Sequence, residues 1–114
     1  MTDTRKKYWD NSVRITGKFH AISGAGTGRH SGIEYTKFSV LTETLDTRTG
    51  FYRPNYVVCR TYEKELKKNI NELNEGDILS IYGEVISSAG SGELFVLVKE
   101  IVPPGENPGG DKNC

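Results

Sequence analysis

The hydrophobic pattern of this chain has the period of a helix in one stretch only. From residue 12 to residue 22, apolar and polar side chains alternate, which is typical of a half-buried β-strand. Between residues 61 and 73 the spacing of apolar residues becomes four, four and three, as in an amphipathic helix. Strand-like alternation then returns. A chain with one helical stripe among strands is constrained to a small β-rich domain with a single helix.

The pattern places five strands at residues 12–22, 35–42, 55–60, 78–87 and 93–102. The helix lies between the third and fourth strands, and we expect Thr61 to cap it and the stripe to be buried: Tyr62, Leu66, Ile70 and Leu73. Residues 23–32 and 43–54 are expected to be loops, and Gly17 indicates a bulge or a sharp bend in the first strand. This order predicts an all-β, five-stranded OB-fold barrel with one helix. A split α+β sheet is the alternative topology.

The length of 114 residues fits one domain at residues 1–102, followed by a Pro/Gly-rich tail at residues 103–114. The longest apolar run, around residues 94–98, is too short to span a membrane, and residues 1–8 lack the apolar stretch of a secretory signal. The two cysteines, Cys59 and Cys114, do not form a disulfide framework. We therefore expect a cytoplasmic protein.

The net charge is zero, with 15 basic and 15 acidic residues, which argues against a polybasic binder. The charges are nevertheless unevenly spread. Residues 1–30 carry six basic and two acidic groups, a balance of +4, and residues 48–60 carry three arginines and no acid. Two local basic patches on a neutral body are therefore expected.

No pattern in the chain predicts catalysis or a cofactor. The glycine-rich residues 23–30 match neither phosphate-binding motif, so a flexible hairpin loop is expected, with Arg29 and His30 near a nucleic-acid backbone as the alternative. Histidines and cysteines show no zinc-ligand spacing, and the carboxylates that could hold a cation are scattered: Asp46, Asp77 and Glu84. Cys59 alternates with Val57 toward the core, where a cysteine is usually inert. We expect no enzyme, metal or cofactor.

Residues 48–60 interleave three cations with three aromatic rings: Arg48, Phe51, Tyr52, Arg53, Tyr56 and Arg60. Single-stranded nucleic acid is held by this chemistry, because bases stack on rings while cations meet phosphates. Tyr56 and Arg60 have the parity opposite to Val57 and Cys59 and should point outward. Alternatively, Phe51 and Tyr52 cover the barrel and Tyr56 packs on a partner subunit.

Two further aromatic residues, Phe19 and Tyr62, lie on apolar stripes and are expected in the core, whereas Tyr82 is expected to face outward beside the first strand. Tyr8 and Trp9 precede the first strand, and the sequence assigns them no role.

Over residues 11–102 the chain resembles the bacterial and bacteriophage single-stranded-DNA-binding proteins. The matching stretches are residues 11–19 (NSVRITGKF), 38–40 (FSV), the long loop ending in 56–58 (YVV), and 73–85 (LNEGDILSIYGEV). The resemblance implies an OB-fold, sequence-independent binding of single-stranded DNA, and a homo-oligomer, either a dimer or a tetramer. The implied role is the protection of exposed strands in DNA replication or recombination.

The resemblance also assigns residues. The aromatic platform falls on Phe51, Tyr52 and Tyr56, and the basic positions of the first strand fall on Arg14 and Lys18. Two departures from the family's pattern matter, and the second favours a compact, phage-type member in the cytoplasm of a bacterial host or a divergent paralogue. The family's usual tryptophans are absent from the binding strands, and the C-terminal tail lacks the acidic tip that recruits partner enzymes. The alternative function is an OB-fold protein-interaction module of a replication or tRNA-related complex.

Overall fold

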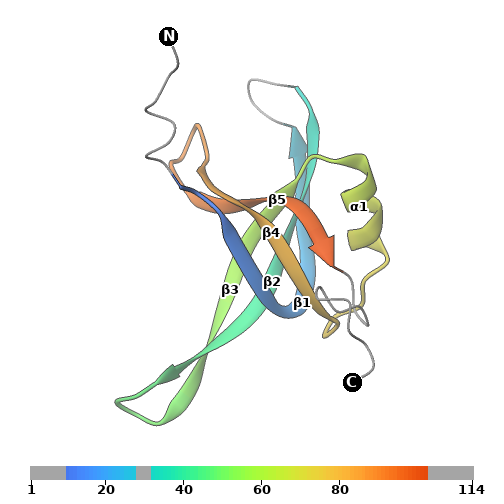
Figure 1. Cartoon of the computed structure of the whole chain (residues 1–114). Helices are drawn as coiled ribbons and strands as arrows, with labels where there is room; N and C mark the ends of the chain where they lie inside the picture. The colour runs from blue at the N-terminus through green and yellow to red at the C-terminus, as the bar shows by residue number, and fades with distance from the viewer. Residues whose placement is uncertain (1–9, 28–31, 103–114) are drawn as a thin grey trace.

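The computed structural model describes residues 10–27 and 32–102, which form a closed five-stranded barrel with one helix (Figure 1). The elements are β1 (Val13–Thr27), β2 (Glu34–Asp46), β3 (Phe51–Thr61), α1 (Lys64–Asn71), β4 (Ile78–Ser87) and β5 (Leu94–Val102). Around the barrel the order is β1-β2-β3-β5-β4; β3 and β5 are parallel, and all other neighbours are antiparallel. The predicted OB-fold barrel, with its helix between the third and fourth strands, is confirmed, and the split sheet is excluded. The predicted tail at residues 103–114 lies outside the described residues.

The first strand pairs with two neighbouring strands. Residues 13–18 of β1 pair with β4, and residues 18–27 pair with β2, so β1 changes partner at Lys18. At the preceding Gly17, a Cβ atom would collide with the carbonyl oxygen of Leu41, so only glycine lets the two strands approach this closely. The sequence predicts a bulge or a sharp bend at Gly17, whereas the register irregularities of β1 lie just after it, between Phe19 and Ala21 and between Ile22 and Gly24.

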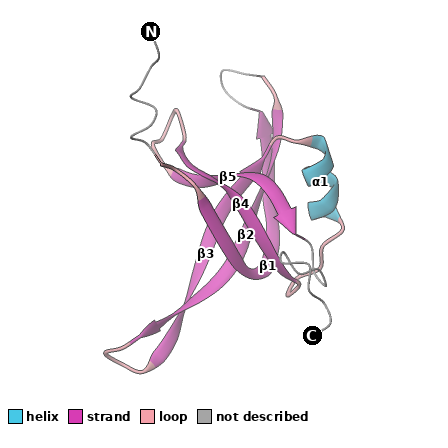
Figure 2. Cartoon of the chain, in the orientation of Figure 1, coloured by secondary structure: helices cyan, strands magenta, loops and turns pink. Residues whose placement is uncertain are grey.

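The core is built from alternate residues of the strands and one face of the helix. Its fully buried members include Phe38, Val40, Cys59, Ile70 and Ile81. Phe19 is buried as predicted, and Val57 packs against the core beside Cys59. Leu66 and Ile70 bury one face of α1, which packs against β5. Figure 2 shows this single helix on the opposite side of the barrel from the β2–β3 hairpin.

Two predictions at the start of the helix are wrong. Thr61 does not cap α1: it is the fully buried last residue of β3, and its hydroxyl accepts a hydrogen bond from the Glu63 backbone N–H at 3.3 Å. This bond stabilises the turn between strand and helix instead. Tyr62, which was expected in the core as part of the helix stripe, precedes the helix and is only half-buried. Its ring packs against Tyr35 with 5.3 Å between ring centroids.

The turn after the helix is fixed to the first strand. Gly76 has a φ of +95°, which favours glycine, and the Asp77 carboxylate accepts a bond from the Asn74 backbone N–H at 2.8 Å. The Gly76 N–H donates to the Phe19 carbonyl, and the Phe19 N–H donates to the Asp77 carbonyl. The Gly-Asp pair of the 73–85 motif therefore connects the helix end to β1 and sets the start of β4.

The largest difference from the sequence prediction lies between β2 and β3. Residues 43–54, expected to be a loop, continue both strands as an uninterrupted ladder from Thr42 opposite Asn55 to Asp46 opposite Phe51. A four-residue turn at residues 47–50 closes this hairpin, which we call the arm (residues 42–55); it projects beyond the barrel (Figure 1). Pro54 is tolerated because β3 pairs with β5 only at Cys59 and Arg60, so this stretch of β3 has an open edge.

The glycine-rich loop predicted at residues 23–32 is also shorter than expected. β1 continues to Thr27 and pairs with β2 as far as Glu34. Arg29 and His30, which the sequence analysis placed near a nucleic-acid backbone, lie outside the described residues.

Candidate nucleic-acid interface

Cross-strand pairing places four residues of four strands in one row on the outside of the barrel. Lys18 of β1 pairs with Ile78 of β4 on one side and with Leu41 of β2 on the other, and Leu41 pairs with Tyr56 of β3. Directly paired residues share a face of the sheet. We call Ile78, Lys18, Leu41 and Tyr56 the outer row. It places an ammonium group between apolar side chains and an aromatic ring.

Tyr56 is the exposed ring of this row. Its side chain is outward as predicted and 55% exposed, and it packs against His20 with 4.9 Å between ring centroids and 58° between planes. His20 lies at the irregularity in β1 between Phe19 and Ala21, and its Nδ1 is 4.0 Å from a Glu75 carboxylate oxygen. His20 therefore supports the Tyr56 ring, while more than half of the side chain remains accessible for stacking.

The arm extends the same face outward. Two residues beyond Tyr56 along the ladder, Pro54 pairs with Glu43; two residues further, Tyr52 pairs with Leu45, and Tyr52 is 64% exposed. Because side chains alternate along a strand, Tyr52 and Tyr56 share one face of the arm.

The other face of the arm is different. It carries Phe51, 73% exposed, opposite Asp46, and Arg53 opposite Thr44. Asn55 on this face donates to the Thr44 hydroxyl at 2.8 Å. The aromatic platform predicted from sequence is therefore divided: Tyr52 and Tyr56 lie on one face, and Phe51 lies on the other.

The remaining predicted arginines have partners of their own. Arg48, at the tip of the arm, donates its backbone N–H to Asp46 at 2.9 Å and lies 3.4 Å from the same carboxylate through Nη2. Arg60 is held between two rings, with its guanidinium carbon 4.5 Å from the centre of Tyr35 and 4.1 Å from that of Phe95. Its Nε is buried and has no hydrogen-bond partner in the described part of the chain. Arg60 thus fastens β2, β3 and β5 together on the outside of the barrel.

Arg14 and Tyr82 form a separate pair further along β1. They are directly opposite each other, and Tyr82 also pairs with Glu100 of β5. Tyr82 is half-buried and faces outward, as predicted. Arg14 lies four residues before Lys18 on the same face, a distance of about 13 Å along the strand. Arg14 and Tyr82 therefore extend the outer face away from the arm.

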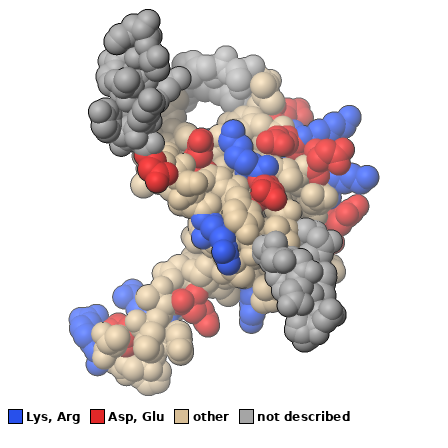
Figure 3. Space-filling model, in the orientation of Figure 1, with Lys and Arg blue, Asp and Glu red and all other residues tan. Residues whose placement is uncertain are grey.

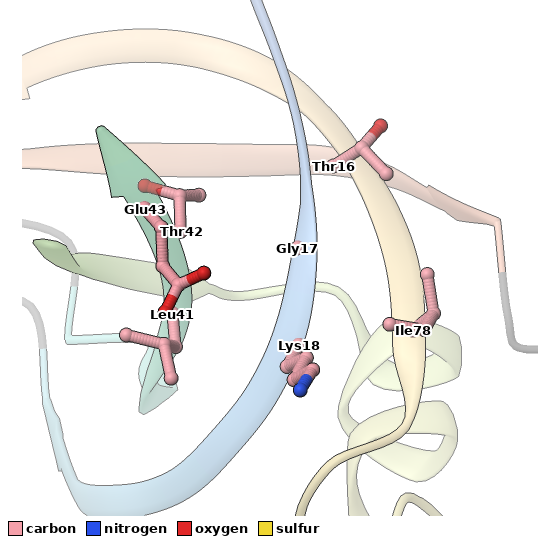
Figure 4. Close-up of a pocket in the computed structure, with 7 residues that line it drawn as sticks. All are labelled: Thr16, Gly17, Lys18, Leu41, Thr42, Glu43 and Ile78. Atoms are coloured by element: carbon pink, nitrogen blue, oxygen red, sulfur yellow. The ribbon is translucent and has the colours of Figure 1, made fainter. Parts of the chain in front are cut away.

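A pocket opens at the fork where β1 leaves β2. Beyond Leu41 the β2 strand enters the arm, whereas β1 turns to β4, and the gap between them encloses about 340 Å³. Figure 4 shows Glu43 reaching from β2 towards β1 in this gap. We call it the fork pocket, lined by Thr16, Gly17, Lys18, Leu41, Thr42, Glu43 and Ile78.

Charges of both signs surround the outer face. Figure 3 shows basic and acidic side chains interspersed over the barrel and at the end of the arm. Within residues 10–27 and 32–102, no three His, Cys, Asp or Glu side chains are grouped so that they could hold a metal ion. Burial raises the pKa of the Cys59 thiol from 9.0 to about 12, so this cysteine is not a nucleophile at neutral pH.

Sequence reasoning missed four residues of this surface: His20, Leu41, Glu43 and Ile78. The first two have unremarkable neighbours in the sequence, and Glu43 was placed in a loop. Only the register between strands joins them to Lys18 and Tyr56. For these four residues the sequence offered no signal, whereas Tyr56 was indicated by its outward parity.

No known protein family matches this sequence, and no curated protein is found to match it. Among solved structures, the mitochondrial single-stranded DNA binding protein Rim1 from S. cerevisiae is similar, with a TM-score of 0.65 and 17% identity over 82% of this chain and 96% of Rim1. The SSB domain of a protein from Synechococcus sp. gives 0.61 and 9%, covering 82% and 94% of the two chains. The protein PriB from Ralstonia solanacearum gives 0.61 and 7%, covering 83% and 99%. These identities establish the OB-fold. In the described residues, no helix is long and apolar enough to cross a membrane.

Proposed function

We propose that this protein binds single-stranded DNA without strong sequence dependence. The observation that carries the proposal is the outer row and its continuation into the arm, where Tyr56 and Tyr52 expose their rings on one face and Lys18 lies between them and β4. Every base has a face that can stack on a ring, and an ammonium group meets the phosphates. In a duplex the bases are already stacked and offer no such faces.

The comparisons support the proposal at the level of the fold. Rim1 is described as a mitochondrial single-stranded DNA binding protein, and its chain superimposes over nearly its whole length. The resemblance in residues 11–19 and 73–85 points the same way. The first stretch includes the start of β1, and the second includes β4 and the turn before it, which is hydrogen-bonded to β1.

The biological setting is part of the proposal. Protection of exposed strands in replication or recombination suits a protein that is indifferent to sequence, and we extend the proposal to a phage-type protein acting in the cytoplasm of a bacterial host. A homo-oligomer, dimer or tetramer, is proposed from the same resemblance. Light scattering of the purified protein, alone and with oligo-dT, tests the assembly; a monomer under both conditions contradicts this part of the proposal.

One observation favours the second candidate, a protein-interaction module. Leu45 and Ile78 are exposed apolar side chains of the outer face, 46% and 52% accessible. A protein partner could cover them.

The deciding experiment is a titration of the purified protein with a fluorescent oligo-dT and with a duplex of equal length at the same salt concentration. We expect saturable binding of the single strand and much weaker binding of the duplex. Duplex binding that is equal or tighter contradicts the proposal. The absence of binding to either favours the interaction module.

A further inference from the structure

The fork pocket has polar groups that the fold does not use. Among the described residues, neither the Glu43 carboxylate nor the Lys18 ammonium forms a side-chain hydrogen bond or an ion pair. The two threonine hydroxyls of the pocket have partners: the Thr16 hydroxyl forms a hydrogen bond with the Ser80 hydroxyl at 2.7 Å, and the Thr42 hydroxyl is 3.5 Å from the Asn55 amide nitrogen. The pocket therefore offers one free carboxylate acceptor and one free ammonium donor beside two apolar side chains, Leu41 and Ile78.

The pocket lies on the proposed path of the strand. Leu41 and Lys18 belong both to the outer row and to the pocket lining, and Leu41 is directly paired with Tyr56. A nucleotide adjacent to one stacked on Tyr56 would therefore reach the pocket. A volume of about 340 Å³ with an apolar wall and a polar edge suits a single planar base.

The charges decide which part of the nucleotide enters. A phosphate would be repelled by the Glu43 carboxylate, so the base rather than the backbone is expected beside it. A carboxylate accepts hydrogen bonds and donates none, so it favours bases that present N–H groups. The Watson–Crick edge of guanine presents two adjacent donors, N1–H and the N2 amino group, which match the two carboxylate oxygens. Thymine presents one N–H between two carbonyl oxygens, which repel a carboxylate.

We propose that the fork pocket reads one base of the bound strand, and that Glu43 gives it a preference for guanine over thymine, while Lys18, which also belongs to the outer row, meets the adjacent phosphate outside the pocket. This inference rests on the proposed function. The stacking on Tyr56 and Tyr52 remains indifferent to sequence, and the pocket adds a modest bias at one position.

The test compares four oligonucleotides of equal length: oligo-dT, and oligo-dT in which isolated positions are replaced by dG, by deoxyinosine or by dA. Deoxyinosine keeps N1–H and lacks the N2 amino group, and dA controls for stronger purine stacking. We expect the dG strand to bind about five-fold more tightly than oligo-dT, the lower end for a two-bond contact because Glu43 is exposed. The deoxyinosine and dA strands should fall closer to oligo-dT.

The variant Glu43→Gln keeps the size of the side chain and removes the paired acceptor. It should abolish the preference for dG, which is read as the ratio of the affinities for the dG strand and for oligo-dT. Glu84→Gln, an exposed glutamate of β4 that does not line the pocket, is the matched control and should keep the preference. The inference is overturned if the wild type binds the four strands equally, or if Glu43→Gln keeps the preference. In both outcomes single-strand binding itself survives. If no strand binds at all, the proposed function fails, and this inference fails with it.

Discussion

At the scale of single residues, the structure separates aromatic side chains that look equivalent in the sequence. Tyr56 and Phe51 are both exposed aromatic residues of β3, but they lie on opposite faces of the hairpin. Removal of a stacked ring costs about 1–3 kcal/mol of binding free energy. Tyr56→Ala should therefore weaken oligo-dT binding by that amount and leave the melting temperature nearly unchanged, because the ring is largely exposed.

Phe51→Ala is the matched control for Tyr56→Ala. It removes a ring of similar exposure from the other face of the arm, so its effect on oligo-dT affinity should be clearly smaller. Titrations and thermal melts of both variants provide the measurement. If Phe51→Ala weakens binding as much as Tyr56→Ala, the strand does not follow the outer face alone.

Cys59 is a residue whose burial has consequences for stability. The pKa of its thiol is raised from 9.0 to about 12 because burial penalises the thiolate. Above pH 9 the unfolded chain loses this proton while the folded chain keeps it, so the folded state binds more protons. The free energy of unfolding should then fall with rising pH, by up to about 1.4 kcal/mol per pH unit from this group.

Urea titrations of the wild type and of Cys59→Ala between pH 8 and pH 10.5 isolate this contribution. Below pH 9 the difference between their unfolding free energies should be constant; above pH 9 the advantage of the wild type should shrink. A constant difference over the whole range would mean that the thiol ionises equally in both states.

At the scale of elements, the arm is separable from the barrel. Its residues contribute none of the buried core, which ends at Val40 on β2 and is flanked by Val57 on β3. Thr42 and Asn55 are directly paired, so a two-residue turn can join them. Replacing residues 43–54 by Asn-Gly should keep the melting temperature within a few degrees while weakening oligo-dT binding at least about ten-fold, since Tyr52 is lost.

Circular dichroism melts and oligo-dT titrations check this deletion. A second deletion that keeps Tyr52 and Tyr56 and shortens only the turn at residues 47–50 should bind almost normally. Loss of folding in the first variant would show that the arm contributes to the barrel, and unchanged affinity would remove the arm from the interface.

The elements also show what can be predicted from the sequence. The order of strands and helix, the burial of Phe19 and Cys59 and the outward direction of Tyr56 all follow from local periodicity, which survives folding. The arm could not be predicted from this periodicity, because Pro54 and the Thr-Gly pair at residues 49–50 are typical of loops. Pro54 is compatible with a strand only because that edge of β3 is open, and openness is a property of the assembled sheet.

The candidate site was harder to predict for the same reason. Parity places Arg60 outward, but it does not show that Tyr35 and Phe95 would close around the guanidinium from two other strands. Parity likewise cannot predict that Lys18 lies beside Leu41 and Tyr56, because that prediction requires the register of three strands. The sequence indicates which residue types suit the proposed binding of single-stranded DNA. The pairing of the strands in the barrel determines which of these residues share a surface.

At the scale of the whole molecule, the closed barrel and the balanced charge act together. Closure pairs each strand of the barrel with two neighbours, although the stretch of β3 before Cys59 keeps an open edge, so recognition depends on side chains of the outer face and on the arm. With a net charge of zero, no long-range field draws the protein to nucleic acid, and only local cations can displace counterions from phosphates.

The salt dependence of binding should therefore be shallow. Of the predicted cations, Arg48 is paired with Asp46, Arg60 is held between rings, and Arg53 lies on the other face of the arm, which leaves Lys18 and Arg14 as the candidates for phosphate contacts. With a contribution of about −0.7 per phosphate on single strands, roughly two contacts give a slope of about −1.4 in a plot of log affinity against log salt concentration. Oligo-dT titrations between low and moderate salt measure this slope.

Single substitutions then assign the slope to residues. Lys18→Gln should make it shallower by about 0.7, because Lys18 lies in the outer row. Lys64→Gln removes another exposed lysine at the start of α1, the helix that lies on the side of the barrel opposite the arm (Figure 2), and should leave the slope unchanged. A wild-type slope steeper than about −5 would demand more phosphate contacts than this face can supply. A slope of zero would show that these cations do not meet phosphates, and the outer row would then be a surface for apolar contacts alone.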